Sequence, residues 1–142
     1  MKPVYSLAFL VLLIAATACS GEILDDASYD NDVCEDLAVK IERHDSISQP
    51  EYEQMICQNA AILRFLIEKS RKIAEEPQGD RPNSWRDLLA DPEYMERFSY
   101  MFTLGSALYQ AEVDGRLDEK NTKLYKKLDR YNQELVEYSE RN

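Results

Sequence analysis

The 142-residue sequence contains few glycines and prolines, four and five respectively. This scarcity disfavours a fold of many short strands joined by turns, and it favours long helices. Basic residues are also few, because 17 Lys and Arg stand against 27 Asp and Glu. The net charge of −10 therefore makes nucleic acid a poor candidate partner. Hydrophobic residues still make up 44% of the chain, which is enough to form a core and disfavours wholesale disorder.

The first 18 residues have the pattern of a secretory signal. Lys2 provides a positive charge, residues 4–16 are uncharged and mostly apolar, and residues 16–19 read ATAC. The apolar run is well short of the roughly 20 residues that a membrane-spanning helix needs. We therefore predict that 1–18 is a removed leader rather than a retained membrane span. Loss of Lys2 with the leader would change the net charge from −10 to −11.

The segment 16–19 resembles the lipobox of bacterial lipoproteins, in which the cysteine is acylated and becomes the mature N-terminus. Ala16 stands where that pattern usually has Leu. The resemblance implies lipidation of Cys19 and attachment to the bacterial envelope, and Ser20 implies the outer membrane by similarity to the sorting rule of enteric bacteria. The alternative is ordinary cleavage that leaves Cys19 as a free terminal thiol. Residues 19–31 are polar and acidic, and we predict that they form a flexible tether.

Residues 32–142 predict a single all-α domain, a small helical bundle of about four main helices. Apolar residues recur at helical spacing, and capping residues mark several helix starts, among them a capping box from Ser48 to Glu51. The uncharged stretch 98–111 predicts the central, most buried helix. The predicted helices cover about 32–44, 48–76, 83–90, 92–114 and 118–140.

Two further details concern helix packing. Gly105 interrupts the uncharged stretch, which predicts either a weak point in the helix or, preferably, a close approach to another backbone. The last predicted helix has a narrow apolar stripe with heptad spacing, and Tyr125 lies off that stripe. This pattern fits one seam packed on the body of the bundle. The stripe consists of Leu124, Leu128, Tyr131, Leu135 and Tyr138.

Cys34 and Cys57 are equidistant from the turn predicted near Asp45 and Ser46. In an antiparallel helical hairpin, residues equidistant from the turn lie opposite each other. We therefore predict a Cys34–Cys57 disulfide that links the first two helices, as suits an exported protein. The alternative is a pair of buried free thiols that do not meet.

The sequence contains no recognisable reaction centre. The only His, His44, falls at a predicted helix end, and no Ser or Cys stands in a known nucleophile motif. Residues 110–121 resemble a calcium-binding EF-hand loop at several positions but depart from it at the first and the last, where strong ligands belong. A helix end at Gly115 followed by a helix start at Asp118 explains this segment better. We predict no enzyme activity, no metal and no cofactor.

Charge and location together favour a protein-binding role. The domain resembles, in class only, the immunity proteins that guard a bacterial envelope against toxins, since these are often small, acidic and helical. Negative charge steers a basic toxin to its inhibitor, although it also keeps a small lipoprotein soluble. The alternatives are a structural adaptor of an envelope secretion or transport complex and, with less support, a hydrolase or small-ligand binder. The predicted partner-binding residues are Glu112, Asp114, Asp118, Glu119 and Tyr125.

Overall fold

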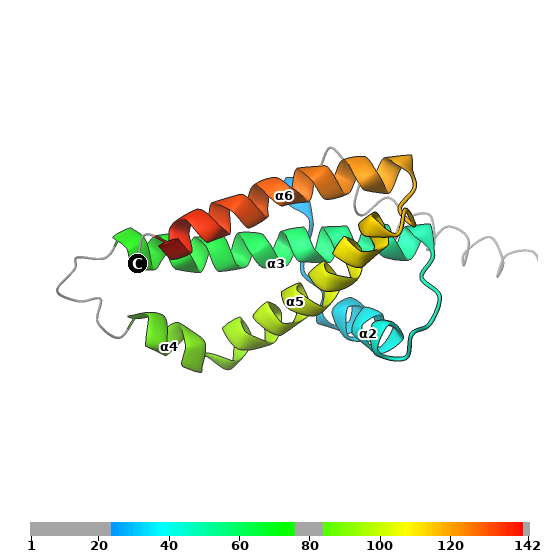
Figure 1. Cartoon of the computed structure of the whole chain (residues 1–142). Helices are drawn as coiled ribbons and strands as arrows, with labels where there is room; N and C mark the ends of the chain where they lie inside the picture. The colour runs from blue at the N-terminus through cyan, green and yellow to red at the C-terminus, as the bar shows by residue number, and fades with distance from the viewer. Residues whose placement is uncertain (1–23, 76–83, 141–142) are drawn as a thin grey trace, which may run out of the picture.

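The computed structural model describes residues 24–75 and 84–140. Every regular element in these two ranges is a helix, which confirms the predicted all-α class (Figure 1). The bounds of the long helices lie close to the predicted ones. The elements are η1 (Leu24–Asp26), α2 (Asn31–Glu42), α3 (Gln49–Glu75), α4 (Ser84–Ala90), α5 (Pro92–Val113) and α6 (Glu119–Glu140).

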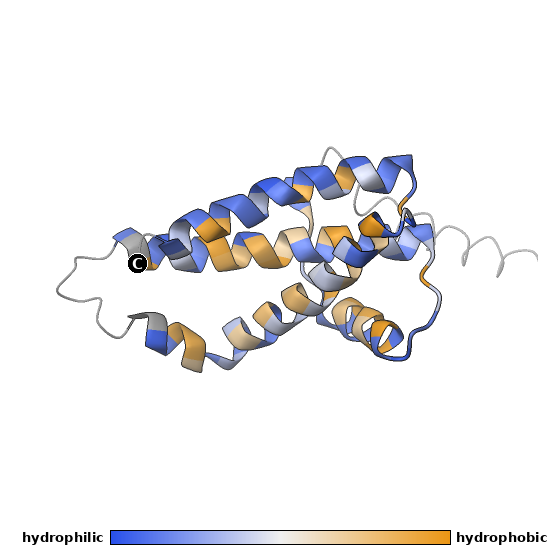
Figure 2. Ribbon diagram, in the orientation of Figure 1, coloured by the Kyte–Doolittle hydropathy of each residue, from blue (hydrophilic) through white to orange (hydrophobic). Residues whose placement is uncertain are grey.

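The centre of the bundle is α3, which contacts α2, α5 and α6. In Figure 1, α5 runs antiparallel to α3 and α6 runs parallel to it, while α2 is seen nearly end-on. Figure 2 shows long apolar stretches on α3, whereas the visible side of α6 is mostly hydrophilic. The largest fully buried side chains of α3 are Met55, Ile56, Ile62, Leu63 and Leu66. The wide apolar face of this helix therefore forms the core.

The prediction that 98–111 forms the most buried helix is wrong. One side of α5 is buried through Leu104 and Leu108, but Phe102 and Tyr109 are 68% and 61% exposed. An uncharged helix has no charged face to mark its solvent side, so its composition does not reveal how many neighbours cover it. The buried helix is α3, because helices pack on it from several directions.

Local sequence explains where the helices begin and end. Ser48 and Glu51 form the predicted capping box: the Glu51 N–H donates to Ser48 Oγ at 3.3 Å, and the Ser48 N–H donates to Glu51 Oε1 at 3.1 Å. Asp91 and Asp118 accept backbone N–H bonds at the starts of α5 and α6. Gly115, with φ of 69°, follows α5 in the left-handed conformation, as the predicted helix end requires.

The predicted Cys34–Cys57 disulfide is wrong, because Cys34 is a free and fully buried thiol. Its Sγ lies 3.5 Å from Oε1 of Gln58, the residue after Cys57 on α3. The two helices therefore meet near the predicted level, but α2 crosses α3 instead of running antiparallel to it (Figure 1). In a crossing pair, distance from the turn does not decide which side chains face each other. The first two helices consequently form no Cys34–Cys57-linked hairpin.

The described part of the predicted tether, residues 24–31, packs on the bundle instead of leading away from it. Leu24 and Ala27 are buried, and the Arg64 guanidinium donates hydrogen bonds to the backbone carbonyls of both. The acidic composition of the segment did not indicate this docking. The contact consists of two buried apolar side chains, Leu24 and Ala27, and of the hydrogen bonds that their backbone carbonyls accept.

The Gln58 side chain extends the same contact toward the start of α2. Its Oε1 accepts a bond from the Asp30 N–H at 2.8 Å, and its Nε2 donates to the Ser28 carbonyl at 3.0 Å.

The predicted leader 1–18 and Cys19 lie outside the described residues. None of the helices within 24–75 and 84–140 is long and apolar enough to cross a membrane.

Candidate functional site

A row of exposed apolar side chains runs along α5. Phe102 is 68% exposed, Tyr109 and Val113 are each 61% exposed, and Met95 and Phe98 are 37% and 39% exposed. Their spacings of three, four, seven and four residues place them on one side of the helix. We call this row the α5 face. Contiguous exposed apolar surface on a protein often marks an interaction site.

Beside the α5 face, a groove of about 430 Å³ lies between α5 and α6. Phe102 and Tyr109 line it from α5, Tyr125 and Asn132 line it from α6, and Asn59 contributes from α3. We call it the α5–α6 groove. Apolar walls with a small number of polar groups are typical of binding sites.

Asn59 and Gly105 meet at the floor of the α5–α6 groove. Asn59 is 2% exposed, and its Oδ1 has no hydrogen-bond partner. A Cβ on Gly105 would lie 3.2 Å from Asn59 Nδ2. Gly105 is thus closely packed, but the predicted approach to another backbone is wrong, because the neighbour is a side chain. Buried polar atoms are nearly always paired, and Asn59 Oδ1, which solvent does not reach, is an exception.

One end of the α5–α6 groove is acidic. Burial raises the pKa of the Tyr125 hydroxyl, and the carboxylates of Asp129 and Glu112 raise it further. Two acids from different helices therefore act on the same hydroxyl. Neither acid lines the groove itself, and the residues that do line it include neither Lys nor Arg. Negative charge beside this end of the groove favours the approach of cationic groups.

The structure brings two of the predicted partner-binding residues, Glu112 and Tyr125, to this acidic end. Tyr125 is only 8% exposed, so most of its side chain is not available to a partner. Its position off the heptad stripe turns it toward α5, where it forms a wall of the groove. Sequence reasoning missed Asp129 and Asn132, although positions 125, 129 and 132 share one side of a helix.

The other three predicted residues are exposed but have local partners. Both carboxylate oxygens of Asp114 accept hydrogen bonds at 3.0 Å, one from Gln110 and one from Arg116. Asp118 caps α6, and Glu119 pairs with a lysine on the next turn. Across the described residues, no three His, Cys, Asp or Glu side chains are placed to hold a metal ion.

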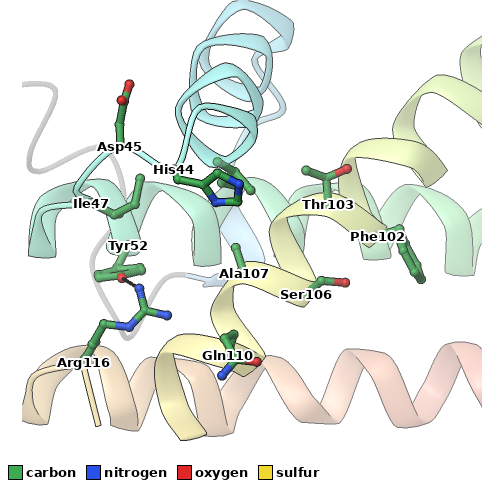
Figure 3. A pocket seen from close by; sticks show the side chains of 11 residues that line it. His44, Asp45, Ile47, Tyr52, Phe102, Thr103, Ser106, Ala107, Gln110 and Arg116 are labelled. Atoms are coloured by element: carbon green, nitrogen blue, oxygen red, sulfur yellow. Dashed lines mark hydrogen bonds between the residues drawn. The ribbon is translucent and has the colours of Figure 1, made fainter. Parts of the chain in front are cut away.

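A second cavity, of about 490 Å³, lies between α5, the start of α3 and the segment that follows α2 (Figure 3). His44 is exposed at this mouth, as predicted for a residue at a helix end, and its backbone is left-handed with φ of 56°. Arg116 donates to the Tyr52 hydroxyl at 3.2 Å on the opposite side. Phe102 and Ser106 line both this cavity and the α5–α6 groove, so α5 stands between them as a ridge.

No protein-family model matches the chain, and comparisons with curated proteins and with solved structures likewise find no match.

Proposed function

We propose that the chain is a lipid-anchored protein of the bacterial cell envelope that binds a protein partner, acting as an immunity protein that neutralises an envelope-acting toxin. The observation that carries this proposal is the α5 face, where Phe102 and Tyr109 are 68% and 61% exposed. Burying a large aromatic side chain at an interface contributes strongly to affinity, so such residues commonly anchor protein contacts.

Charge supports a basic partner. The chain has a net charge of −10, and the carboxylates of Glu112 and Asp129 act together at one end of the α5–α6 groove. Complementary charge accelerates the encounter of two proteins and disfavours partners of the same sign. A cationic toxin is the partner class that benefits most from this arrangement.

The sequence resemblance at 16–19 supports the location. Acylation of Cys19 would hold the domain at the envelope, on the outer membrane by similarity to enteric sorting, where a toxin acting outside the cytoplasm must pass. An inhibitor confined to that surface meets its toxin at a high local concentration.

The test starts in the native host, with a photo-reactive amino acid in place of Phe102. Leu89 of α4, which is 60% exposed and does not line the groove, provides the matched control position. A protein captured at position 102 and not at position 89 is then produced in the periplasm of a sensitive strain. We expect the exported chain to protect these cells, and we expect Phe102→Asp at equal abundance to protect far less.

Full protection by Phe102→Asp would contradict the assignment of the α5 face. Capture of only secretion or transport subunits, with no protection against any of them, would instead identify the chain as a structural adaptor of such a complex. Either outcome would overturn the corresponding part of the proposal.

A further inference from the structure

The α5–α6 groove favours a helical occupant. Its walls are two helices that both pack on α3 (Figure 1). A further helix laid between them would interlock with them by ridges of side chains, as in other helical bundles. A peptide that binds by adding a strand to a sheet would need an open strand edge, and the described residues contain no strand.

The α5 face sets the length of that occupant. Met95 and Val113 stand at its two ends, which are about 27 Å apart for a helical rise of ~1.5 Å per residue. At about 200 Å² for each fully exposed large side chain, the face presents roughly 500 Å² of apolar surface. An occupant helix of about five turns would cover it and form an interface at the small end of the specific range.

Charge argues against a second copy of the chain as the occupant. Arg97 is the one basic residue between Pro92 and Val113, and its guanidinium lies 4.3 Å and 4.1 Å from the ring centres of Tyr29 and Phe65. A second α5 would therefore bring further carboxylates, and no available cation, to the acidic end of the groove. Two copies with the same large negative charge also repel each other.

We propose that the α5–α6 groove binds an amphipathic helix of a partner protein, with its apolar side on Phe102 and Tyr109 and a Lys or Arg between Glu112 and Asp129. At the floor of the groove, Gly105 lies beside Asn59 Nδ2 and brings no side chain into the groove. This inference rests on the proposed protein-binding function and specifies the chemistry of the segment that is bound.

The test uses the purified full chain in non-ionic detergent and two fluorescent peptides of about 20 residues. Both peptides carry the same leucine stripe, but one has Lys and Arg near one end and the other has Glu at those positions. Fluorescence anisotropy, corrected with empty micelles, measures the binding. We expect the basic peptide to bind at least about tenfold more tightly than the acidic one, and its affinity to fall as salt rises.

Variants of the chain locate the binding surface. Phe102→Asp is expected to weaken the basic peptide by at least about tenfold. The double variant Glu112→Gln with Asp129→Asn is expected to reduce the preference for the basic peptide, because it removes both charges and keeps similar shapes. Leu89→Asp places the same charge on α4 and should bind as the wild type does. Circular dichroism establishes that each variant is folded.

Equal binding of the two peptides, or unchanged binding in Phe102→Asp, would overturn the proposal. A dimer in light scattering that Phe102→Asp dissociates would assign the face to a second copy, and so would also overturn it. The assay uses no toxin, so it is independent of the protection test. If the peptides do not bind but the chain still protects cells, only the proposed helical occupant of the groove is rejected. Peptide binding without protection of cells would reject the immunity function alone.

Discussion

At the residue scale, burial controls the acid–base behaviour of two side chains near the N-terminal segment. Burial raises the pKa of the Cys34 thiol to about 12, with a further contribution from Asp30, and burial also raises the pKa of the Tyr29 hydroxyl to about 12. In the unfolded chain these groups titrate at about 8.5 and about 10. Above those values the unfolded chain loses protons that the folded chain keeps, so stability falls as pH rises.

We therefore expect the urea midpoint to fall progressively between pH 8.5 and pH 12, as ordinary unfolded pKa values of about 8.5 and about 10 require. In Cys34→Ala the fall should be shallower near its start, because only Tyr29 of the two groups remains. Denaturation curves at a series of pH values measure both slopes. A wild-type midpoint that rises with pH over this window would contradict the raised pKa values of Cys34 and Tyr29.

At the scale of the element, α5 has a buried side and an exposed side that both carry large apolar residues. Only the buried side is expected to contribute strongly to the free energy of unfolding. Leu104 and Leu108 are fully buried, so truncating either to Ala should cost about 2 to 5 kcal/mol of stability. Phe102→Ala and Tyr109→Ala remove exposed side chains and should change stability by less than about 0.5 kcal/mol. Chemical denaturation of the four variants tests this contrast, and a cost at Phe102 equal to that at Leu104 would show that the α5 face is covered.

At the scale of the whole molecule, the docked N-terminal segment limits how far the domain can stand from a membrane. Leu24 is buried and its 3-10 helix packs on α3, so a lipid on Cys19 would leave five residue steps, at most about 18 Å of chain, between anchor and domain. We expect a palmitate analogue to label the wild type in a lipoprotein-processing host and not to label Cys19→Ala. We also expect the variant to leave the membrane fraction. Label that persists in Cys19→Ala would reject acylation at this residue.

The helix ends were predictable because local groups determine them. The capping box of Ser48 and Glu51, the cap at Asp91 and the left-handed Gly115 each satisfy backbone groups within a few residues along the chain. These contacts form in the same way whatever the helix later packs against. The all-α class and most helix bounds therefore followed from the sequence by itself.

The tertiary structure alone decided which apolar surfaces are covered. The sequence of 98–111 is uncharged all round, yet one side packs on α3 and Phe102 remains 68% exposed on the other. Likewise, α2 crosses α3 steeply, so Cys34 contacts Gln58 and does not pair with Cys57. The position of α6 beside α5 decides that Tyr125 lines the groove between them. Crossing angles depend on how ridges of side chains from distant segments interlock, and no periodicity within a single segment encodes that outcome.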